Sequence, residues 1–282
     1  MRSAYFVEKN KMEVREFPKA QLVKETDAII KIVRVCVCGS DLWWFRGISE
    51  RQPGPVGHEA IGVIEEVGAG VKNFKVGDFV IVPFTHGCGH CPICLAGFEA
   101  NCPNAKDGVN GGYQGEFYRA INADGALVKI PGRPSDYSEE QLASLTTLAD
   151  VMPTGFHAAK AADVHEGDTV VVFGDGAVGL CAVISAKLLG AKRIIAMRRH
   201  EDRAALARDF GATDIIAEHG AEAIQKIMAI TNGYGADAAL ECVGTKEAIE
   251  SAFQAVRAGG RVGRVGVPHD VDYNEWIDSL FW

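Results

Sequence analysis

This 282-residue sequence lacks any apolar run long enough to span a membrane as a helix. Its first ten residues carry Arg2, Glu8 and Lys9 around a short apolar patch, so they cannot serve as the core of a signal peptide. It also lacks a stripe of Lys and Arg that could follow a phosphate backbone, since 29 basic residues against 37 acidic ones leave a net charge of -8. We therefore expect a soluble, cytoplasmic protein that binds neither membranes nor nucleic acid.

The sequence has no internal repeat and no low-complexity tract, so its length is the best guide to its number of domains. With 282 residues, 48% of them apolar, it is long for one hydrophobic core and has enough apolar residues to fill two. The first half contains short stretches typical of β-strands, separated by Gly-rich and Pro-rich turns: residues 28–37, 60–67, 78–82 and 126–130. We expect an irregular β domain there, followed by a helical segment within residues 138–152.

From Glu166 onward, expected strands alternate with expected helices. The strands are residues 169–173, 193–197, 213–216, 236–242 and 261–265, and the helices are residues 177–189, 201–210 and 246–257. Alternation of this kind predicts a parallel sheet and an α/β fold, because a parallel connection usually runs through a helix. Pro153 disfavours helical backbone at the residue before it, which places the domain boundary near Val151.

Half of the eight cysteines lie in one short segment, separated by two, two and seven residues: Cys88, Cys91, Cys94 and Cys102. This is the spacing of metal ligands, and the Gly and Pro residues between them supply turns that let the thiolates converge. We predict a closed, structural zinc site with four sulfur ligands. The alternatives are a reduced cysteine-rich loop or two disulfides. Three of the other cysteines lie in apolar patterns where a free thiol packs, which favours a reducing compartment: Cys36, Cys181 and Cys242.

A glycine-rich turn follows the expected strand 169–173 and opens the next expected helix. It has the pattern GxGxxG, with Gly174, Gly176 and Gly179 at the glycine positions. Glycine allows the tight turn and the close approach of a pyrophosphate, and the helix N-terminus offers N–H groups to phosphate. We predict that these three glycines bind a dinucleotide together with Ala177 and Val178. The alternative is a strand-to-helix turn without a ligand.

The strand after the glycine-rich turn ends in two arginines, Arg198 and Arg199. An NAD site would carry Asp or Glu at this place to hold the ribose 2'-hydroxyl. A guanidinium group instead matches the 2'-phosphate of NADP. The sequence therefore predicts NADP(H) in preference to NAD(H), with a solvated basic turn as the alternative.

Taken together, several motifs resemble those of the zinc-dependent medium-chain alcohol dehydrogenases. They follow the family's order over nearly the whole chain: Cys38-Gly39-Ser40-Asp41, Gly57-His58-Glu59-Ala60-Ile61-Gly62, the four cysteines, Gly111-Gly112-Tyr113, Asp150 with Thr154-Gly155, and the glycine-rich turn. The resemblance implies a GroES-like catalytic domain at residues 1–151 and a doubly wound Rossmann domain for NADP(H) at residues 152–282, with the active site between them. It also implies that Thr154 contacts the cofactor.

The resemblance further implies a second, catalytic zinc ion. Its ligands would be Cys38, His58 and Asp150, whose two negative charges balance Zn²⁺ and leave a fourth position for water or a substrate oxygen. Glu59 resembles a glutamate that lies behind the metal, and Asp41 an acid that fixes the tautomer of the zinc histidine. Taken singly, each ligand has an ordinary alternative: Cys38 as a packed thiol, His58 as a loop histidine and Asp150 as a helix cap.

The implied reaction is hydride transfer between a secondary alcohol or its ketone and the nicotinamide. Zinc would act as a Lewis acid on the substrate oxygen. Ser40 lies where family members relay the released proton, with an ordinary turn serine as the alternative. Trp43 and Trp44 either wall an apolar substrate pocket or belong to the core. The alternative functions are polyol or threonine dehydrogenase activity, or a noncatalytic NADP(H)-binding protein on the same scaffold.

The sequence ends at Trp282, soon after the fifth expected strand of the Rossmann domain. The resemblance implies that the sixth strand, which usually pairs across a dimer axis, is missing, so we expect a truncated Rossmann domain. It also implies a homo-oligomer that acts on small molecules. Without a sixth strand, residues 261–265 would form an exposed sheet edge, and we expect residues 272–282 to cover it as a short amphipathic helix.

Overall fold

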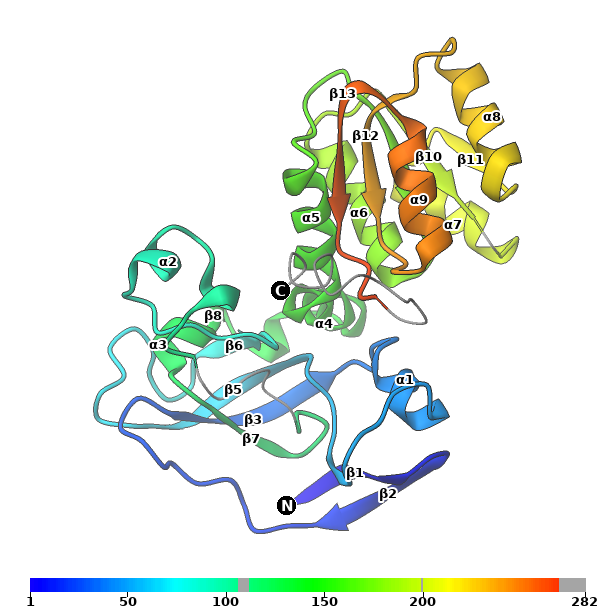
Figure 1. The fold of residues 1–282 in the computed structure, drawn as a ribbon. Helices are drawn as coiled ribbons and strands as arrows, with labels where there is room; N and C mark the ends of the chain where they lie inside the picture. Colours follow the sequence, from blue (N-terminus) through cyan, green and yellow to red (C-terminus); the bar gives the residue numbers. More distant parts are fainter. Residues whose placement is uncertain (106–111, 199, 269–282) are drawn as a thin grey trace. The chain divides into compact units, whose positions relative to one another are not determined.

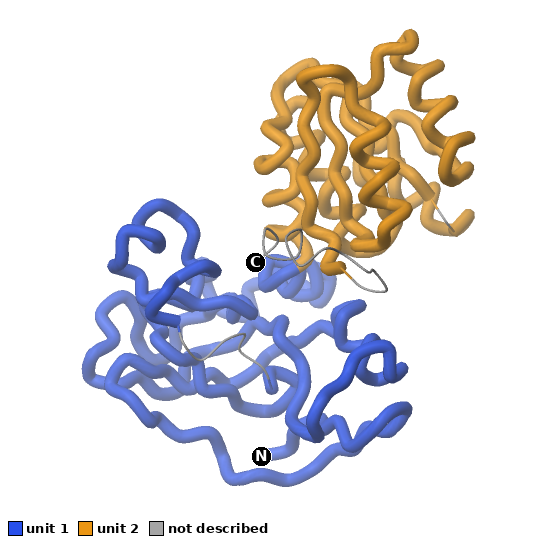
Figure 2. The backbone as a smooth tube through the Cα atoms, viewed as in Figure 1, with its two compact units in different colours: residues 1–150 blue, residues 151–282 orange. Residues whose placement is uncertain are grey.

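The computed structural model describes residues 1–105, 112–198 and 200–268. The chain forms two compact units, residues 1–150 and 151–282, which are coloured separately in Figure 2. The described part of the chain contains no helix with both the length and the hydropathy needed to cross a membrane.

The described residues of the first unit form two antiparallel sheets (Figure 1). The three-stranded sheet has the order β2-β1-β4, with β1 at Arg2–Glu8, β2 at Lys11–Glu16 and β4 at Gly54–Pro55. The five-stranded sheet has the order β7-β3-β5-β6-β8, from Phe117–Ala120, Ala28–Val35, Ala60–Val67, Phe79–Val82 and Val128–Ile130. Four short helices accompany the sheets: α1 (Asp41–Arg46), α2 (Pro92–Leu95), α3 (Ala123–Ala126) and α4 (Glu139–Thr146).

The five-stranded sheet buries apolar side chains on both faces. Ile30 and Val80 belong to one buried cluster. Ile61 and Phe79 belong to the other, where they pack with Leu142 of α4. Neighbouring residues such as Phe79 and Val80 serve opposite faces because successive side chains of a strand alternate. Since full burial of one such side chain is worth roughly 1.5–3 kcal/mol, this packing holds α4 and the residues after it against the sheet.

The predicted strands of the first unit are confirmed, and four further strands were not predicted. Residues 60–67 form β5 as predicted, while β3, β6 and β8 are each one or two residues shorter than expected. The strands β1, β2, β4 and β7 were missed. In β2 no residue is buried, and β7 has only four residues, so neither carries a strong apolar pattern.

In the described part of the second unit, five strands form a parallel sheet in the order β11-β10-β9-β12-β13. The strands are β9 (Thr169–Phe173), β10 (Arg193–Met197), β11 (Asp214–Ile216), β12 (Ala236–Glu241) and β13 (Val256–Arg264). Chain order runs outward from β9 in both directions, so the sheet is doubly wound and its switch point lies between β9 and β12. The predicted α/β class with a β-rich part and a Rossmann sheet is therefore confirmed.

Helices cover both faces of the parallel sheet (Figure 1). One buried cluster joins the sheet to α5 (Val151–Ala161), α6 (Ala177–Leu188) and α7 (Asp202–Phe210). The other joins it to α8 (Gly220–Ile230) and α9 (Lys246–Ala255). We did not predict α8, which lies between the third and fourth strands, or α5. Met152 is helical, against our expectation, because Pro153 lies in the first turn of α5, where proline is tolerated.

The end of α9 corrects one prediction. We expected a helix through Arg257 and a strand only from Arg261, but the helix ends at Ala255 and β13 begins at Val256. Val256 pairs with Ala236, and the register then shifts so that Ala238 pairs with Arg261. The residues between form a bulge in β13 that includes Gly259 at φ +76°. The helix predicted for residues 272–282 lies outside the described residues.

Candidate active site

Four side chains that can bind a metal come together in the first unit, from three places in the sequence: Cys38, His58, Glu59 and Asp150. Cys38 follows β3, and His58 and Glu59 directly precede β5. The antiparallel pairing of Val35 with Ala60 brings these two chain ends together. Two of the three segments are therefore placed by strand pairing alone.

Asp150 reaches the cluster by a different route. It follows the 3-10 helix Thr147–Ala149, which continues from α4. Ala149 and Leu142 are buried in the same apolar cluster as Ile61 of β5. Packing of α4 on the sheet thus places the carboxylate of Asp150 near the start of β5.

The donor atoms of this cluster are close enough to share one ion. The Nε2 atom of His58 lies 3.2 Å from Oδ2 of Asp150 and 3.9 Å from Oε1 of Glu59. The Sγ atom of Cys38 lies 3.8 Å from the same Oδ2 of Asp150. One ligand atom from each of the four residues lies within 4.8 Å of all the others. A tetrahedral zinc site with bonds of about 2.0–2.3 Å has edges of about 3.3–3.8 Å, so the spacing fits zinc.

Asp41, the first residue of α1, contacts two members of the cluster, His58 and Cys38. Its Oδ1 atom lies 3.4 Å from Nδ1 of His58, and its Oδ2 atom accepts a hydrogen bond of 3.1 Å from the backbone N–H of Cys38. The carboxylate is buried, so water competes little for these contacts. A carboxylate at Nδ1 favours the tautomer that leaves the Nε2 lone pair directed at Asp150 and Cys38.

The electrostatics of the cluster favour a cation. Burial lowers the pKa of His58, but hydrogen bonds with Asp150, Asp41 and Cys38 outweigh burial and raise that pKa to about 12. Burial, together with the charge of Asp150, raises the pKa of Glu59 to about 7. Neither carboxylate oxygen of Glu59 has a hydrogen bond within the described residues. The cluster therefore has an excess of negative groups, which a divalent ion would balance.

Ser40 directly precedes α1, and the two tryptophans, Trp43 and Trp44, lie within it. Ser40 is the N-cap residue of α1, is partly buried and makes no side-chain capping bond. Trp44 packs edge-on against Phe6 with ring centroids 4.7 Å apart, and the guanidinium of Arg51 lies 4.9 Å above its ring. These contacts favour the core role for Trp44 over a place in a substrate pocket. Trp43 is partly buried.

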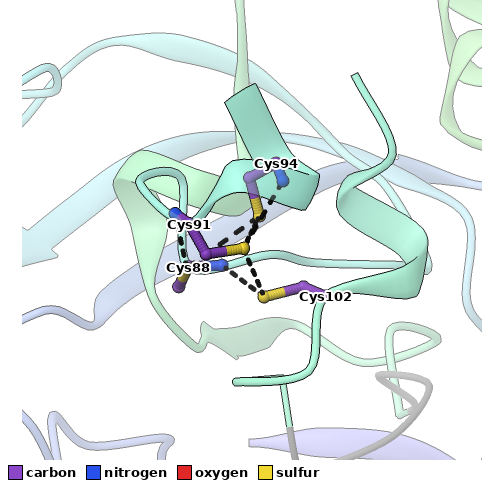
Figure 3. Close-up of side chains that lie close together, drawn as sticks. All are labelled: Cys88, Cys91, Cys94 and Cys102. Atoms are coloured by element: carbon purple, nitrogen blue, oxygen red, sulfur yellow. Dashed lines mark hydrogen bonds between the residues drawn. The ribbon is translucent and has the colours of Figure 1, made fainter. Parts of the chain in front are cut away.

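The four-cysteine cluster lies elsewhere in the first unit, around α2 (Figure 3). The Sγ atoms are 3.5 Å apart for Cys91 and Cys94, 3.8 Å for Cys91 and Cys102, and 3.9 Å for Cys88 and Cys94. A tetrahedron of sulfurs about 2.3 Å from zinc has edges of about 3.8 Å, so the sulfurs lie where zinc needs them. All eight cysteines are free, so the alternative with two disulfides is not formed.

Hydrogen bonds prepare the sulfurs to carry charge. The N–H groups of Cys88, Cys91 and Cys94 each donate to a sulfur of the cluster, over 3.3–3.4 Å. The side-chain amide of Asn104 donates to Cys88 and, with backbone N–H groups, lowers the pKa of that thiol to about 5. A Cβ atom at Gly87 would lie 2.7 Å from the sulfur of Cys94, so only glycine fits there. We had not predicted Asn104, because an asparagine beyond the last cysteine carries no signal in the sequence.

In the second unit, the glycine-rich turn joins β9 to α6 as predicted. Gly174 has φ +121°, and a Cβ atom at Gly179 would lie 2.0 Å from the carbonyl oxygen of Gly174, so both positions need glycine. A Cβ atom at Gly176 would meet nothing within 4 Å, which leaves space for a ligand beside the N-terminus of α6. Gly176 and Ala177 are exposed there, whereas Val178 is partly buried.

Thr154 and Arg198 also belong to the second unit. Thr154 lies in α5, which packs closely on α6: a Cβ atom at Gly155 would lie 2.5 Å from the backbone nitrogen of Ala182. Arg198 follows β10 directly, is partly buried and pairs with Glu201 at 3.0 Å. Arg199 lies outside the described residues.

Two contacts that we had not predicted join His200, and Arg203 of α7, to the glycine-rich turn. Asp175 accepts a hydrogen bond of 2.8 Å from the backbone N–H of His200, and its other oxygen pairs with Arg203 at 3.1 Å. The sequence marks Asp175 only as a variable position of the glycine pattern. His200 and Arg203 are thus held beside the turn.

Comparison with known proteins finds a family match for each half of the chain. Residues 24–132 match the alcohol dehydrogenase GroES-like domain, and residues 177–275 match the zinc-binding dehydrogenase domain. The zinc-type alcohol dehydrogenase B of Aspergillus flavus is 37% identical over 279 residues, which cover 95% of this chain and 64% of that protein. The NADP-dependent isopropanol dehydrogenase of Thermoanaerobacter brockii is 38% identical over 252 residues, 85% of this chain and 68% of that protein.

A solved structure gives the same result. The alcohol dehydrogenase TADH from Thermus sp. ATN1 is 32% identical, with a TM-score of 0.84 over 97% of this chain and 78% of that one. The chain spans about two thirds of the length of the two enzymes named above. The sequence motifs, both domain matches and the folds of both units agree. The chain belongs to the zinc-dependent medium-chain alcohol dehydrogenases.

Proposed function

We propose that this protein transfers a hydride between a secondary alcohol or its ketone and a nicotinamide cofactor, with zinc bound at the active site. The observation that carries the proposal is the cluster of Cys38, His58, Glu59 and Asp150, whose ligand atoms all lie within 4.8 Å of one another. Residues 1–151 would form the catalytic domain and residues 152–282 the cofactor-binding domain.

Three residues would hold the catalytic zinc: Cys38 through sulfur, His58 through Nε2 and Asp150 through a carboxylate oxygen. When bound, zinc supplies a Lewis acid that polarises the oxygen of the alcohol or ketone. Asp41 holds His58 in the required tautomer through its contact with Nδ1. Glu59 is buried next to His58 with its oxygens unbonded among the described residues, so it would be available as a further oxygen ligand to the metal.

Ser40 is the proposed carrier of the proton that an alcohol releases on oxidation. Its hydroxyl is not used as a helix cap, and it can donate one hydrogen bond while accepting another. It lies two residues after Cys38 and is partly buried. A proton would leave the substrate oxygen through this hydroxyl towards solvent.

The four-cysteine cluster is proposed to hold a second, structural zinc. Its four thiolates complete the coordination shell, so no position remains for substrate. The N–H groups that donate to the sulfurs of Cys88, Cys91 and Cys102 would stabilise the negative charge of these thiolates. This zinc would fix the fold of residues 88–102 and take no part in the reaction.

The second unit is proposed to bind NADP(H) more tightly than NAD(H). Gly174, Gly176 and the N-terminus of α6 would face the pyrophosphate. Arg198, at the carboxyl end of β10, would meet the 2'-phosphate together with Arg199. The names of the isopropanol dehydrogenases of Thermoanaerobacter brockii and Clostridium beijerinckii, as NADP-dependent relatives, support this preference.

An assay on protein of measured zinc content tests the function. We expect NADPH oxidation with small ketones and NADP⁺ reduction with secondary alcohols, and weaker activity with polyols or threonine. Arg198→Ala should raise the Kd for NADPH about tenfold or more and change the Kd for NADH little, because only NADPH carries the 2'-phosphate. Protein that holds two zinc ions per chain but is inert towards every alcohol, polyol and ketone would contradict the proposal.

A further inference from the structure

A buried carboxylate lies at the carboxyl edge of the parallel sheet, where the proposed chemistry does not use it. Glu241 is the last residue of β12 and is fully buried. Its neighbours in the sheet register are Phe173 of β9 and Arg264 of β13. An acidic side chain is costly at such a position unless its oxygens are hydrogen-bonded, so its bonds show what it does there.

The hydrogen bonds of Glu241 hold the ends of two strands together. Its Oε1 atom accepts the backbone N–H groups of Val243 and Gly244, both at 2.7 Å. Its backbone carbonyl accepts the N–H groups of Val265 and Gly266, at 2.9 and 3.0 Å. One residue thus fixes the loop after β12 and joins it to the loop after β13.

The two loops interlock so closely that no side chain fits between them. A Cβ atom at Gly266 would lie 2.2 Å from the nitrogen of Gly244 and 2.7 Å from Oε2 of Glu241. Gly244 has φ +88°, and a Cβ atom there would lie 2.1 Å from the carbonyl oxygen of Val267. The conformation of residues 242–244 therefore depends on the bonds that Glu241 makes to their N–H groups.

Residues 242–244 also lie against the glycine-rich turn. A Cβ atom at Gly174 would lie 3.2 Å from Cγ2 of Val243 and 3.4 Å from Cβ of Cys242, and the N–H of Cys242 donates to the carbonyl of Phe173 at 3.0 Å. The chain adds strands on one side of β9 up to β11 and then on the other side from β12, so the switch point of the sheet lies between β9 and β12. The loops after these two strands flank it. Ligands of doubly wound sheets bind in the crevice at that point.

We infer that Glu241 is a positioning residue that fixes residues 242–244 as the wall on which the nicotinamide half of the cofactor rests. The pyrophosphate would bind at Gly174 and Gly176 on the β9 side of the switch point. The adenosine half lies towards β10, which carries Arg198, so the nicotinamide half must lie towards β12. Glu241 stays beneath the loop and does not touch the cofactor. This inference rests on the proposed binding of a dinucleotide by the second unit.

Glu241→Ala in the 282-residue chain tests the inference, with two probes in equilibrium titrations. NADPH contains both halves of the cofactor, whereas adenosine 2',5'-bisphosphate contains only the adenosine half. We expect the Kd for NADPH to rise about tenfold or more and the Kd for the bisphosphate to stay within about twofold. Glu241→Gln, which keeps one acceptor oxygen, should shift the NADPH Kd in the same direction by a smaller factor and serves if the alanine variant does not fold.

Asp237→Asn is the matched control, because it changes the other carboxylate of β12, at the opposite end of the strand. Asp237 accepts the N–H of Thr169 at 2.8 Å, so its loss should lower the melting temperature without changing the ratio of the two dissociation constants. Equal weakening of both probes in the Glu241 variants, or no weakening of NADPH binding, would overturn the inference. Wild-type protein that binds neither probe would instead refute dinucleotide binding itself, and this inference with it.

Discussion

The two clusters of candidate zinc ligands in the first unit differ in how the sequence brings their donors together. The four cysteines lie within residues 88–102, and their own turns bring the sulfurs to 3.5–3.9 Å. Cys38, His58 and Asp150 are spread over more than a hundred residues, and strand pairing and helix packing bring them together. The first cluster organises a local segment, whereas the second depends on the folded sheet.

The donors differ as well. The cysteine cluster has four sulfur donors, and backbone N–H groups donate to those of Cys88, Cys91 and Cys102. The mixed cluster has sulfur, nitrogen and oxygen donors, and an extra carboxylate, Glu59, whose oxygens are not bonded among the described residues. Four strong ligands close a zinc site, whereas three protein ligands leave a fourth position open to substrate. One site should therefore affect stability and the other turnover.

The largest effect should follow from Cys38→Ser. Loss of one of the three proposed ligands should remove one zinc per chain and lower kcat/KM by about a thousandfold or more, because the Lewis acid is lost. The melting temperature should change little, since the sheet holds the segment without metal. Zinc analysis, steady-state kinetics and thermal melting check this. A variant that keeps two zinc ions and its activity would remove Cys38 from the site.

Cys94→Ser should give the opposite pattern. It should also remove one zinc, but it should lower the free energy of unfolding by at least about 2 kcal/mol while kcat/KM per folded molecule stays within about threefold. Cys181→Ala, which changes a buried cysteine of the second unit, is the matched control and should leave the zinc content unchanged. A loss of turnover as large as that of Cys38→Ser would show that the two sites are not independent.

A smaller effect is expected for Asp41→Asn. The amide cannot hold the tautomer of His58 as a carboxylate does, so zinc affinity and kcat/KM should fall about tenfold to a hundredfold. Asp78→Asn is a suitable control, because Asp78 is another buried aspartate of the same unit and pairs with Lys129 at 2.8 Å. Competition with a chelator measures the affinity. If both variants weaken zinc binding equally, Asp41 has no special role.

The same contrast explains how much could be predicted from the sequence. The four cysteines form a motif whose spacing alone implies their convergence, and the glycine-rich turn follows an obvious apolar strand. The sequence around Asp150 does not indicate its partners, because its proximity to Cys38 depends on α4 packing against β5. Only the resemblance to the family suggested Asp150 as a zinc ligand. The roles of these site residues stay predictions.

Other features left no readable signal. The strand β2 is exposed, β4 and β7 are short, and β1 carries an unbroken apolar run at residues 4–7, so all four lack the apolar alternation that marks a strand. In the sequence, Glu241 is only a polar residue at the end of an apolar strand. Its inferred role depends on the backbone N–H groups of two neighbouring loops, which donate hydrogen bonds to its oxygen atoms. Asn104 acts through a sulfur that only the fold brings near it.

Stepwise removal of zinc, with activity measured in parallel, shows whether the two clusters hold two zinc ions with separate roles. We expect two zinc ions per chain: a chelator should first remove one, with all turnover, while the fold persists, and the second only under conditions that also loosen residues 88–102. A protein that binds a single zinc, or that keeps its turnover after the first ion has left, would show that the two clusters do not have these roles.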